Sequence, residues 1–191
     1  MDLADVEWLA ARLDALLVID EAYVEFAGED ALSLAEMYGN ILILRTFSKA
    51  LCGAGLRIGY AIGQAGLIEQ ILKTLSPYNL GIMATEAIRV ILVHRDELIP
   101  RHIAVVAERQ RLIAALRTCQ GTAVLPSRAN FVCLRTPISG ATLTATLAQQ
   151  GIYVRDLSDN PSLQDAIRIT VGTRQENDVL ITFLRRELEA K

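Results

Sequence analysis

Two short, uninterrupted apolar runs most strongly limit what this chain can fold into. They are LLVI at residues 16–19 and ILIL at residues 41–44, and a segment with helical spacing lies between them, around residues 31–38. A short run that is apolar at every position is typical of a strand covered on both faces, as in a parallel sheet. Apolar residues make up 52% of the chain and aromatic residues only 5%, as in helix-rich α/β proteins. We therefore predict an α/β fold with an open, mostly parallel sheet, whose ligands bind beyond the carboxyl ends of the strands.

The remaining pattern divides the 191 residues into two lobes. Helical spacing marks residues 3–13, and a further strand, GLRIGYAIG, is expected at residues 55–63. The expected elements of the second lobe are strands at 130–136, 152–156 and 166–171, a helix at 140–149, and a last helix opened by the capping-box pair Thr173 and Glu176. We assign residues 1–82 to a large domain, 83–119 to bridging helices with a bend or break near Pro100, and 120–191 to a small α+β domain.

Charge, cysteine spacing and hydropathy exclude several classes of function. The formal net charge is −3 with no basic block, so we expect neither nucleic acid nor a membrane as a partner. Cys52, Cys119 and Cys133 lack zinc-type spacing, and His94 and His102 stand outside any cluster of carboxylates or thiols, so no metal site is expected. No run approaches the ~20 apolar residues that cross a bilayer, and the acidic start, MDLADVEW, has no signal-peptide pattern. These features favour a cytoplasmic protein with reduced thiols.

Six polar residues follow or border the expected strands: Asp20, Tyr23, Thr46, Ser48, Lys49 and Arg57. If the chain is extended at TFSK, its two hydroxyls face the same side and can bind one anion together with the two-pronged arginine. A lysine that is partly out of water near that arginine has a lowered pKa and can attack a carbonyl. A carboxylate at the neighbouring strand end can hold a protonated ring nitrogen. Phosphate, aldehyde and pyridinium occur together in pyridoxal 5′-phosphate (PLP).

Each of these residues also has a simpler interpretation. A lone lysine is more often a solvated loop residue, the arginine could pair with a carboxylate, and the aspartate could cap a helix. Their order along the chain and their placement at strand ends favour the cofactor site.

Two segments carry a resemblance to a known family. VIDEAYVEF and TFSKALCGAGLRIGYAIG resemble the fold-type I PLP-dependent enzymes of the aspartate aminotransferase superfamily. PYNL, ANFVCLR, GIYVRDLS and IRITVGTRQEN are similar to the histidinol-phosphate aminotransferase subfamily. The resemblance implies that Asp20 bonds the pyridine nitrogen and Tyr23 the phenolic oxygen. Lys49 would form the internal aldimine and then act as the general base. It also implies that the cofactor phosphate is held by Thr46, Ser48 and Arg57.

The same resemblance implies how the substrate is held. Arg168 matches the arginine that binds the substrate α-carboxylate, and Tyr78 and Arg155 match positions near the substrate's side-chain end. We expect Arg155 and Arg168 to be well separated, as suits a substrate with an anionic group, although Arg155 could equally form a salt bridge between the lobes. Asn130 is either a second anchor or a turn residue. The implied reaction converts histidinol phosphate and 2-oxoglutarate to imidazole acetol phosphate and glutamate, in a homodimer.

The chain also departs from the family pattern. Family members carry a long N-terminal part, with a phosphate-binding turn, a stacking aromatic ring and an Asn-Pro segment, which we do not find here. The resemblance therefore makes residues 1–82 the C-terminal part of the large PLP-binding domain, with an apolar sheet edge left exposed, and we expect this chain alone to capture PLP weakly or not at all. The alternatives are a non-catalytic truncated remnant, a threonine-phosphate decarboxylase-like protein and an aromatic amino-acid aminotransferase.

Overall fold

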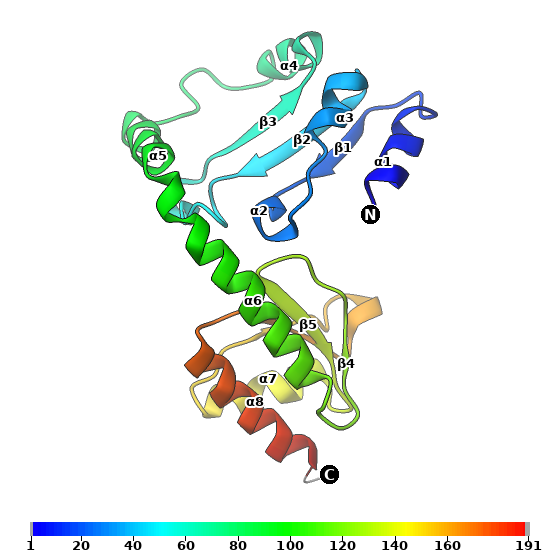
Figure 1. Ribbon diagram of the computed structural model, residues 1–191, viewed down its shortest axis with the longest axis vertical. Coiled ribbons are helices and arrows are strands. Elements are labelled where there is room, and N and C mark those ends of the chain that lie inside the picture. The colour runs from blue at the N-terminus through cyan, green and yellow to red at the C-terminus, as the bar shows by residue number, and fades with distance from the viewer. Residues whose placement is uncertain (1, 190–191) are drawn as a thin grey trace. The chain divides into compact units, whose positions relative to one another are not determined.

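The chain forms two compact units, Met1–Pro100 and Arg101–Lys191, which are described separately (Figure 1). The computed structural model describes residues 2–189, and at Glu189 its backbone alone. The boundary lies within helix α6, Ile99–Leu116, whose buried residues all belong to the second unit. Strands and helices occur in both units, which confirms the predicted α/β class.

The first unit is built on a three-stranded sheet with the order β1-β2-β3. The two apolar runs form β1, Leu17–Asp20, and β2, Ile41–Thr46, and these strands pair in parallel as predicted. Strand β3, Gly59–Gly63, pairs antiparallel with β2. The predicted strand at 55–63 is therefore too long: Arg57 has a positive φ of 56°, which an extended strand cannot accommodate.

One face of this sheet is buried and the other is open. Helices α1, Leu3–Ala10, and α3, Leu32–Met37, pack on the face that carries Ile41 and Ile43, both fully buried. On the opposite face Val18 is 49% exposed and Leu44 is 39% exposed. On this second face Leu42 is buried, and Leu67 lies near Gly63 of β3, so the described residues of the first unit cover the face only in part.

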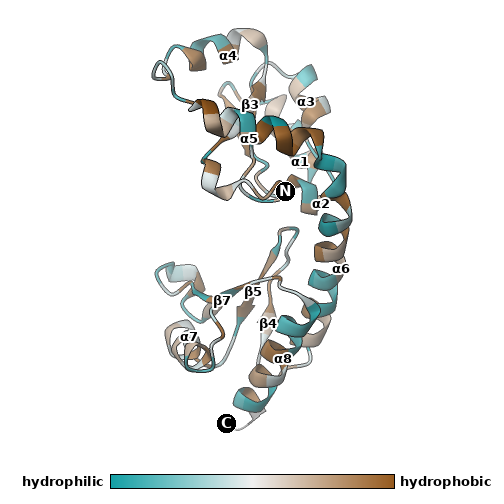
Figure 2. Ribbon diagram, turned by 90° about the vertical axis from the view of Figure 1, so that its left-hand side faces the viewer, coloured by the Kyte–Doolittle hydropathy of each residue, from teal (hydrophilic) through white to brown (hydrophobic). Residues whose placement is uncertain are grey.

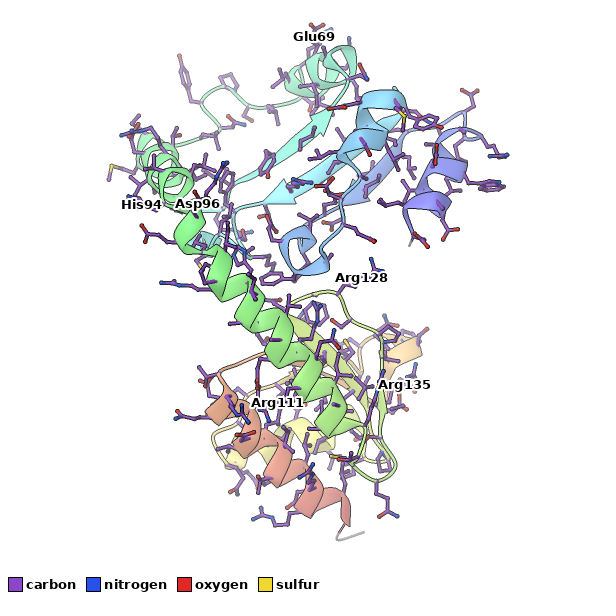
Figure 3. The ribbon with its side chains drawn as sticks, viewed as in Figure 1. Glu69, His94, Asp96, Arg111, Arg128 and Arg135 are labelled. Carbon is purple, nitrogen blue, oxygen red and sulfur yellow. The ribbon has the colours of Figure 1, made fainter. Side chains whose placement is uncertain are left out.

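The first unit also contains the α-helices α2, Val24–Ala27; α4, Ala65–Leu72; and α5, Ile82–Val93, and two short 3-10 helices, Ala54–Leu56 and Arg95–Glu97. The helical segment predicted to bend or break near Pro100 is interrupted just before this proline, because α5 ends at Val93 and α6 begins at Ile99. Pro100 occupies the first turn of α6, where its missing N–H leaves no bond unmade. Figure 3 labels His94 in the intervening turn, where its Nδ1 lies 2.8 Å from Glu97 Oε1.

The second unit pairs a four-stranded antiparallel sheet with three helices, an α+β arrangement. Its strands, in the sheet order β4-β5-β7-β6, are β4, Ala123–Val124; β5, Phe131–Arg135; β7, Ala166–Thr170; and β6, Arg155–Asp156. Its helices are α6; α7, Gly140–Gln149; and α8, Arg174–Glu189. The α7 prediction is confirmed, whereas the strand predicted at 152–156 is reduced to two residues. The backbone there first closes α7, with Gly151 at φ 75° and the Ile152 N–H bonded to Leu147 O.

All three helices cover the same face of this sheet. Val132 and Leu134 of β5 and Ile167 and Ile169 of β7 share one buried cluster with residues of α6, α7 and α8. Brown and teal segments alternate along α6 in Figure 2, as expected for a helix that buries one side only. The predicted capping box also forms, since the Thr173 N–H donates to Glu176 Oε2 at 2.7 Å and the Glu176 N–H donates to Thr173 Oγ1 at 3.3 Å.

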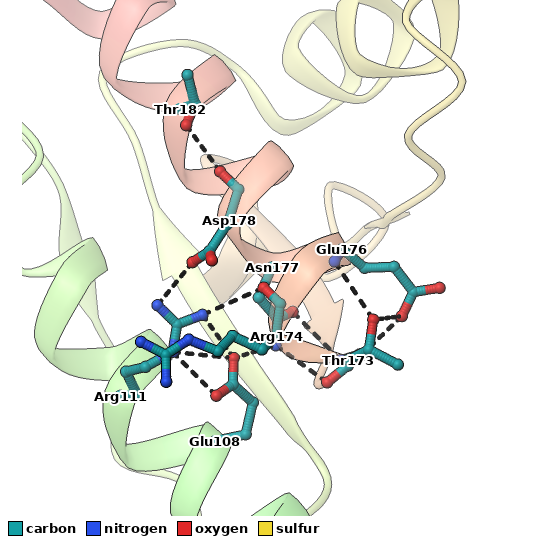
Figure 4. Close-up of polar contacts among 9 residues, drawn as sticks. Glu108, Arg111, Thr173, Arg174, Glu176, Asn177, Asp178 and Thr182 are labelled. Carbon is teal, nitrogen blue, oxygen red and sulfur yellow. Dashed lines mark hydrogen bonds and ion pairs between the residues drawn. The ribbon is translucent and has the colours of Figure 1, made fainter.

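A charged network joins α6 to α8 (Figure 4). Arg111 Nη2 lies 2.6 Å from Glu108 Oε1, and Arg111 Nη1 lies 2.7 Å from Asp178 Oδ1. Asn177 donates to the same Glu108 oxygen at 2.8 Å. The hydrogen bond from Arg111, aided by that from Asn177 and opposed by burial, lowers the pKa of Glu108 below its ordinary 4.5. Helices far apart in the sequence are therefore held together by an ionised carboxylate.

The lowered pKa of Glu108 predicts a pH dependence of stability. Because the folded-state pKa lies below the unfolded value, the stabilisation is complete above pH 4.5 and is lost as the pH falls through the folded-state pKa. We expect Glu108→Gln to lower the free energy of unfolding at pH 7 and to make it less dependent on pH below 4.5. Urea unfolding at a series of pH values measures both effects. The matched control is Glu69→Gln, at an exposed position on α4 (Figure 3), and an equal loss in that variant would contradict the prediction.

Candidate active site

Two polar side chains end neighbouring strands on the open face of the first sheet. Asp20 is the last residue of β1 and Thr46 the last of β2. Asp20 is in register with Leu44, so alternation along β2 puts Asp20, Leu44 and Thr46 on one face. The exposure of Leu44 identifies this as the more open face of the sheet near these strand ends. The carboxyl ends of two parallel strands thus present a carboxylate and a hydroxyl side by side.

The segments that follow these strands meet at Tyr23 and Lys49. Asp20 Oδ1 accepts the Ala22 N–H at 3.0 Å, a local turn that redirects the chain after β1. Lys49 Nζ then lies 5.3 Å from the centroid of the Tyr23 ring, within the range of a cation–π interaction. Lys49 is exposed rather than partly out of water, so the burial that we expected at this amine is not provided by the described residues.

A tight turn follows Thr46 immediately. Thr46 Oγ1 accepts the Ser48 N–H at 3.1 Å and donates to Ile58 O at 3.3 Å. The chain is therefore not extended across TFSK, and the condition under which the two hydroxyls would face the same side is not met. The Thr46 hydroxyl shapes the turn instead, and Ser48 remains half-buried beside Lys49.

The glycines of the next loop let the backbone fold back on β2. A Cβ at Gly53 would lie 3.0 Å from Phe47 O, and one at Gly59 would lie 2.8 Å from Arg45 O. Neither approach leaves room for a side chain. Arg57, between them, is exposed and donates from Nη1 to Ala54 O at 3.0 Å. The loop thus returns the chain to the sheet and places an arginine near the end of β2.

Tyr78 stands apart from these residues. It lies between α4 and α5, its side chain is 99% exposed, and its φ is 56°. A positive φ is an outlier for a bulky residue. Within the first unit, Tyr78 is not brought to the group around Lys49.

The predicted substrate-binding arginines lie in the second unit, directly opposite each other. Arg155 of β6 and Arg168 of β7 are cross-strand partners, and such partners have Cβ atoms only about 5 Å apart. The prediction that they are well separated is therefore wrong, because the strands pair in a register that aligns them. Neither forms an ion pair within the described residues of the second unit.

Phe131 and Cys133 flank Arg168 on the same face. Arg168 Cζ lies 5.1 Å from the centroid of the Phe131 ring, and Cys133 is the β5 partner of Arg168. Burial raises the pKa of the Cys133 thiol, and the charge of Arg168 offsets part of that rise. Asn130 extends the sheet through its backbone, since its carbonyl accepts the Val171 N–H at 2.9 Å.

The arginine pair lies outside the two hollows found along the helices of the second unit. Two hollows of about 420 and 410 Å³ run along α8 and residues 150–154, and neither is lined by Arg155 or Arg168. The two arginines occupy the sheet face opposite the helices, as alternation from the buried Ile167 and Ile169 requires.

A buried ion pair behind the strand ends escaped the sequence analysis. Arg45 and Glu21 are in contact at 2.7 Å. Arg45 directly precedes Thr46 and Glu21 directly follows Asp20, so alternation turns their side chains to the opposite face of the sheet. The sequence feature that could have predicted this pair is the opposite charge of the two residues, since opposite charges on the covered side of neighbouring strands are expected to pair.

The described residues offer an amine, a carboxylate, hydroxyls and guanidinium groups, but no metal centre. No group of three or more His, Cys, Asp or Glu side chains among residues 2–189 could hold a metal ion. No described helix has the length and apolar character needed to cross a membrane.

Known proteins match nearly the whole chain. The family model for aminotransferase class I and II matches residues 1–184. A histidinol-phosphate aminotransferase of Roseiflexus castenholzii is 42% identical over 177 residues, which cover 91% of this chain and 47% of that protein. The chain spans about half the length of the curated relatives it matches.

Two solved structures share the fold. A histidinol-phosphate aminotransferase from Sinorhizobium meliloti, in complex with pyridoxal 5′-phosphate, has a TM-score of 0.84 and 29% identity, and covers 100% of this chain and 54% of its own. An L-threonine-O-3-phosphate decarboxylase from Porphyromonas gingivalis has a TM-score of 0.87 and 26% identity, with 97% and 58% coverage. With the family model matched over residues 1–184 and these relatives alongside it, the resemblance found in the sequence is confirmed: the chain belongs to the aminotransferase class I and II family.

Proposed function

We propose that this chain carries the cofactor-binding lysine of a PLP-dependent histidinol-phosphate aminotransferase. The reaction would move an amino group from histidinol phosphate to 2-oxoglutarate. The observation that carries the proposal is the meeting of Lys49 with Tyr23, at 5.3 Å, beside strand ends that bear Asp20 and Thr46. Family membership and the names of the relatives support the same assignment.

The side chains of the first unit fit PLP by their chemistry. When bound, PLP supplies an aldehyde and a protonated pyridine ring that withdraws electrons from the substrate. Asp20 would hold the proton on the ring nitrogen, and Tyr23 would donate to the phenolic oxygen. Lys49 would bind the aldehyde carbon and then carry a proton to and from the substrate α-carbon as general base. The phosphate would be bound by Thr46, Ser48 and Arg57.

The arginine pair of the second unit would bind the anionic groups of the substrate. Like charges directly opposite each other destabilise a sheet, so an anion beside Arg155 and Arg168 relieves that repulsion while it is recognised. Arg168 would take the α-carboxylate of 2-oxoglutarate, or the phosphate that stands in its place in histidinol phosphate, and Arg155 would lie near the substrate's side-chain end. Tyr78 and Asn130 would also contact the substrate, a proposal that rests on the family resemblance alone. A homodimer is proposed on the same basis.

A second candidate is decarboxylation of an amino-acid phosphate. The similarity to the threonine-phosphate decarboxylase from P. gingivalis supports it, and an amine together with a pair of arginines serves that reaction equally well. Release of carbon dioxide from threonine phosphate, compared with glutamate formation from histidinol phosphate, separates the two candidates.

Borohydride trapping tests the lysine assignment directly. The chain contains three lysines, Lys49, Lys73 and Lys191, so peptide mapping after incubation with PLP and reduction resolves each one. We expect less than one pyridoxyl group per chain, with Lys49 favoured over Lys73 about tenfold, the ratio that ~1.4 kcal/mol of local binding gives. Equal labelling of the two lysines would count against the site, and Asp20→Ala should reduce the preference for Lys49.

A further inference from the structure

Arg45 holds a network on the covered side of the first sheet, directly behind the strand ends. Its side chain is 14% exposed and that of Glu21 is 8% exposed. Arg45 Nε donates to Glu21 Oε2 at 2.9 Å, and Nη2 lies 2.7 Å from the same oxygen and 3.2 Å from Asp30 Oδ2. The other Glu21 oxygen accepts the Ala31 N–H at 2.6 Å. Both oxygens of the Glu21 carboxylate are thus engaged.

This network reaches all three strands. Glu21 directly follows β1, and its N–H donates to Leu44 O of β2 at 2.8 Å. Tyr60 of β3 is the register partner of Arg45. Burial disfavours the charge on Arg45, but the hydrogen bond and charge of Glu21, with Tyr60 and Asp30, outweigh it and raise the pKa of Arg45. The Glu21–Arg45 pair therefore joins the ends of β1 and β2, and Tyr60 of β3 lies opposite Arg45 in the sheet.

The residues of the network alternate with those of the candidate site. Glu21 is the neighbour of Asp20, and Arg45 is the neighbour of Thr46. Adjacent residues in extended chain share a backbone but project to opposite faces. Any shift of the Glu21–Arg45 pair is therefore transmitted to Asp20 and to the turn that carries Lys49.

We infer that Arg45 is a positioning residue of the candidate site. Its guanidinium, clamped by Glu21 and Asp30, sets the distance between the end of β1 that bears Asp20 and the end of β2 that leads to Lys49. The name of the site rests on the proposed function, whereas the positioning effect is a property of the chain alone and is measurable without a cofactor.

The informative substitution is Arg45→Lys. Lysine keeps the positive charge but lacks the planar fork that contacts two carboxylates at once. Arg45→Leu removes the charge as well and leaves Glu21 buried without its partner, which is costly enough to threaten folding. The lysine variant keeps the inference testable if the leucine variant does not fold.

Two backbone amides report on the site in the absence of PLP. The Ala22 N–H bonds Asp20 Oδ1 and the Ser48 N–H bonds Thr46 Oγ1. In amide NMR spectra of the full chain, Arg45→Lys should shift both resonances and speed their hydrogen exchange about tenfold, as local opening without global unfolding does. The amide of Ile43, in the buried middle of β2, should be unchanged.

A matched variant separates positioning from the general loss of an ion pair. Arg111→Lys weakens the contact of Arg111 with Glu108, 2.6 Å long, in the second unit, and should leave Ala22 and Ser48 unchanged. If the amide resonances and hydrogen-exchange rates of Ala22 and Ser48 are unaltered in Arg45→Lys, the inference is overturned. If hydrogen exchange at the Ile43 amide is accelerated as much as at Ala22 and Ser48, the inference is also overturned, because the substitution would then lower the stability of the whole unit.

Borohydride trapping on the same proteins keeps the two proposals distinguishable. If the unsubstituted chain shows no preference for Lys49, the proposed function fails while the NMR comparison still decides the role of Arg45. If the preference is present, Arg45→Lys should lower it, whereas Arg111→Lys should not. Retention of the full preference in Arg45→Lys would contradict positioning of Lys49 through Arg45.

Discussion

Replacement of Lys49 with alanine is expected to lower the rate of amino transfer at least about 10³-fold. The amine would both bind the cofactor aldehyde and move the proton, and a positioned acid–base group alone contributes about 10²–10⁴-fold. The measurement is the turnover of histidinol phosphate with 2-oxoglutarate at saturating PLP. A small added amine such as methylamine should restore part of the rate, since it can carry the proton in place of the missing side chain.

Lys73→Ala is the matched control for this prediction. Lys73 ends α4, and its Nζ donates to Gln70 Oε1 at 2.9 Å, a surface hydrogen bond with no link to the strand ends. We expect its rate to equal that of the unsubstituted protein. A Lys49→Ala protein that kept more than a tenth of the rate would require a different base.

Replacement of Arg168 with alanine is expected to lower kcat/KM about 100-fold. Loss of a two-pronged guanidinium–carboxylate interaction costs about 2–3 kcal/mol, and each 1.36 kcal/mol is tenfold. Most of the change should appear in KM for both substrates, because Arg168 would bind the α-carboxylate of 2-oxoglutarate and the phosphate that takes its place in histidinol phosphate. Steady-state kinetics with each substrate varied in turn measures this.

Arg135→Ala provides the control for Arg168. Arg135 lies on the neighbouring strand β5 (Figure 3), where Nη1 is 3.2 Å from Asp165 Oδ1. Its removal eliminates a guanidinium from the same sheet but leaves Arg155 and Arg168 in place, so KM should be unchanged. A similar rise of KM in Arg135→Ala would show that only the overall charge of the sheet matters.

The fold class and the larger elements could be predicted because they depend on local patterns. The continuous apolar runs became the parallel pair β1 and β2, as is typical of strands in parallel sheets. The segment 140–149 became a helix as its spacing indicates, and the Thr173–Glu176 capping box opens α8. These features need no knowledge of distant residues.

The shorter elements could not be predicted for the opposite reason. The alternation of GLRIGYAIG predicts a strand from residue 55, yet the loop at Arg57 is set by how closely Gly53 and Gly59 approach β2. Likewise, the strand at 152–156 is shortened because α7 ends immediately before it. Contacts with residues elsewhere in the chain override local propensity in both places.

For the candidate site, the residues could be predicted from the sequence, but their arrangement in space could not. Asp20, Thr46, Ser48, Lys49 and Arg57 could be picked out because polar groups at the ends of buried strands have few structural reasons to be there. Tertiary structure decided that Lys49 meets Tyr23, that Arg155 faces Arg168 across two strands, and that Arg45 and Glu21 pair behind the site. The physical reason is that strand register and side-chain facing are set by long-range hydrogen bonds and burial, which act between residues that the linear sequence keeps apart.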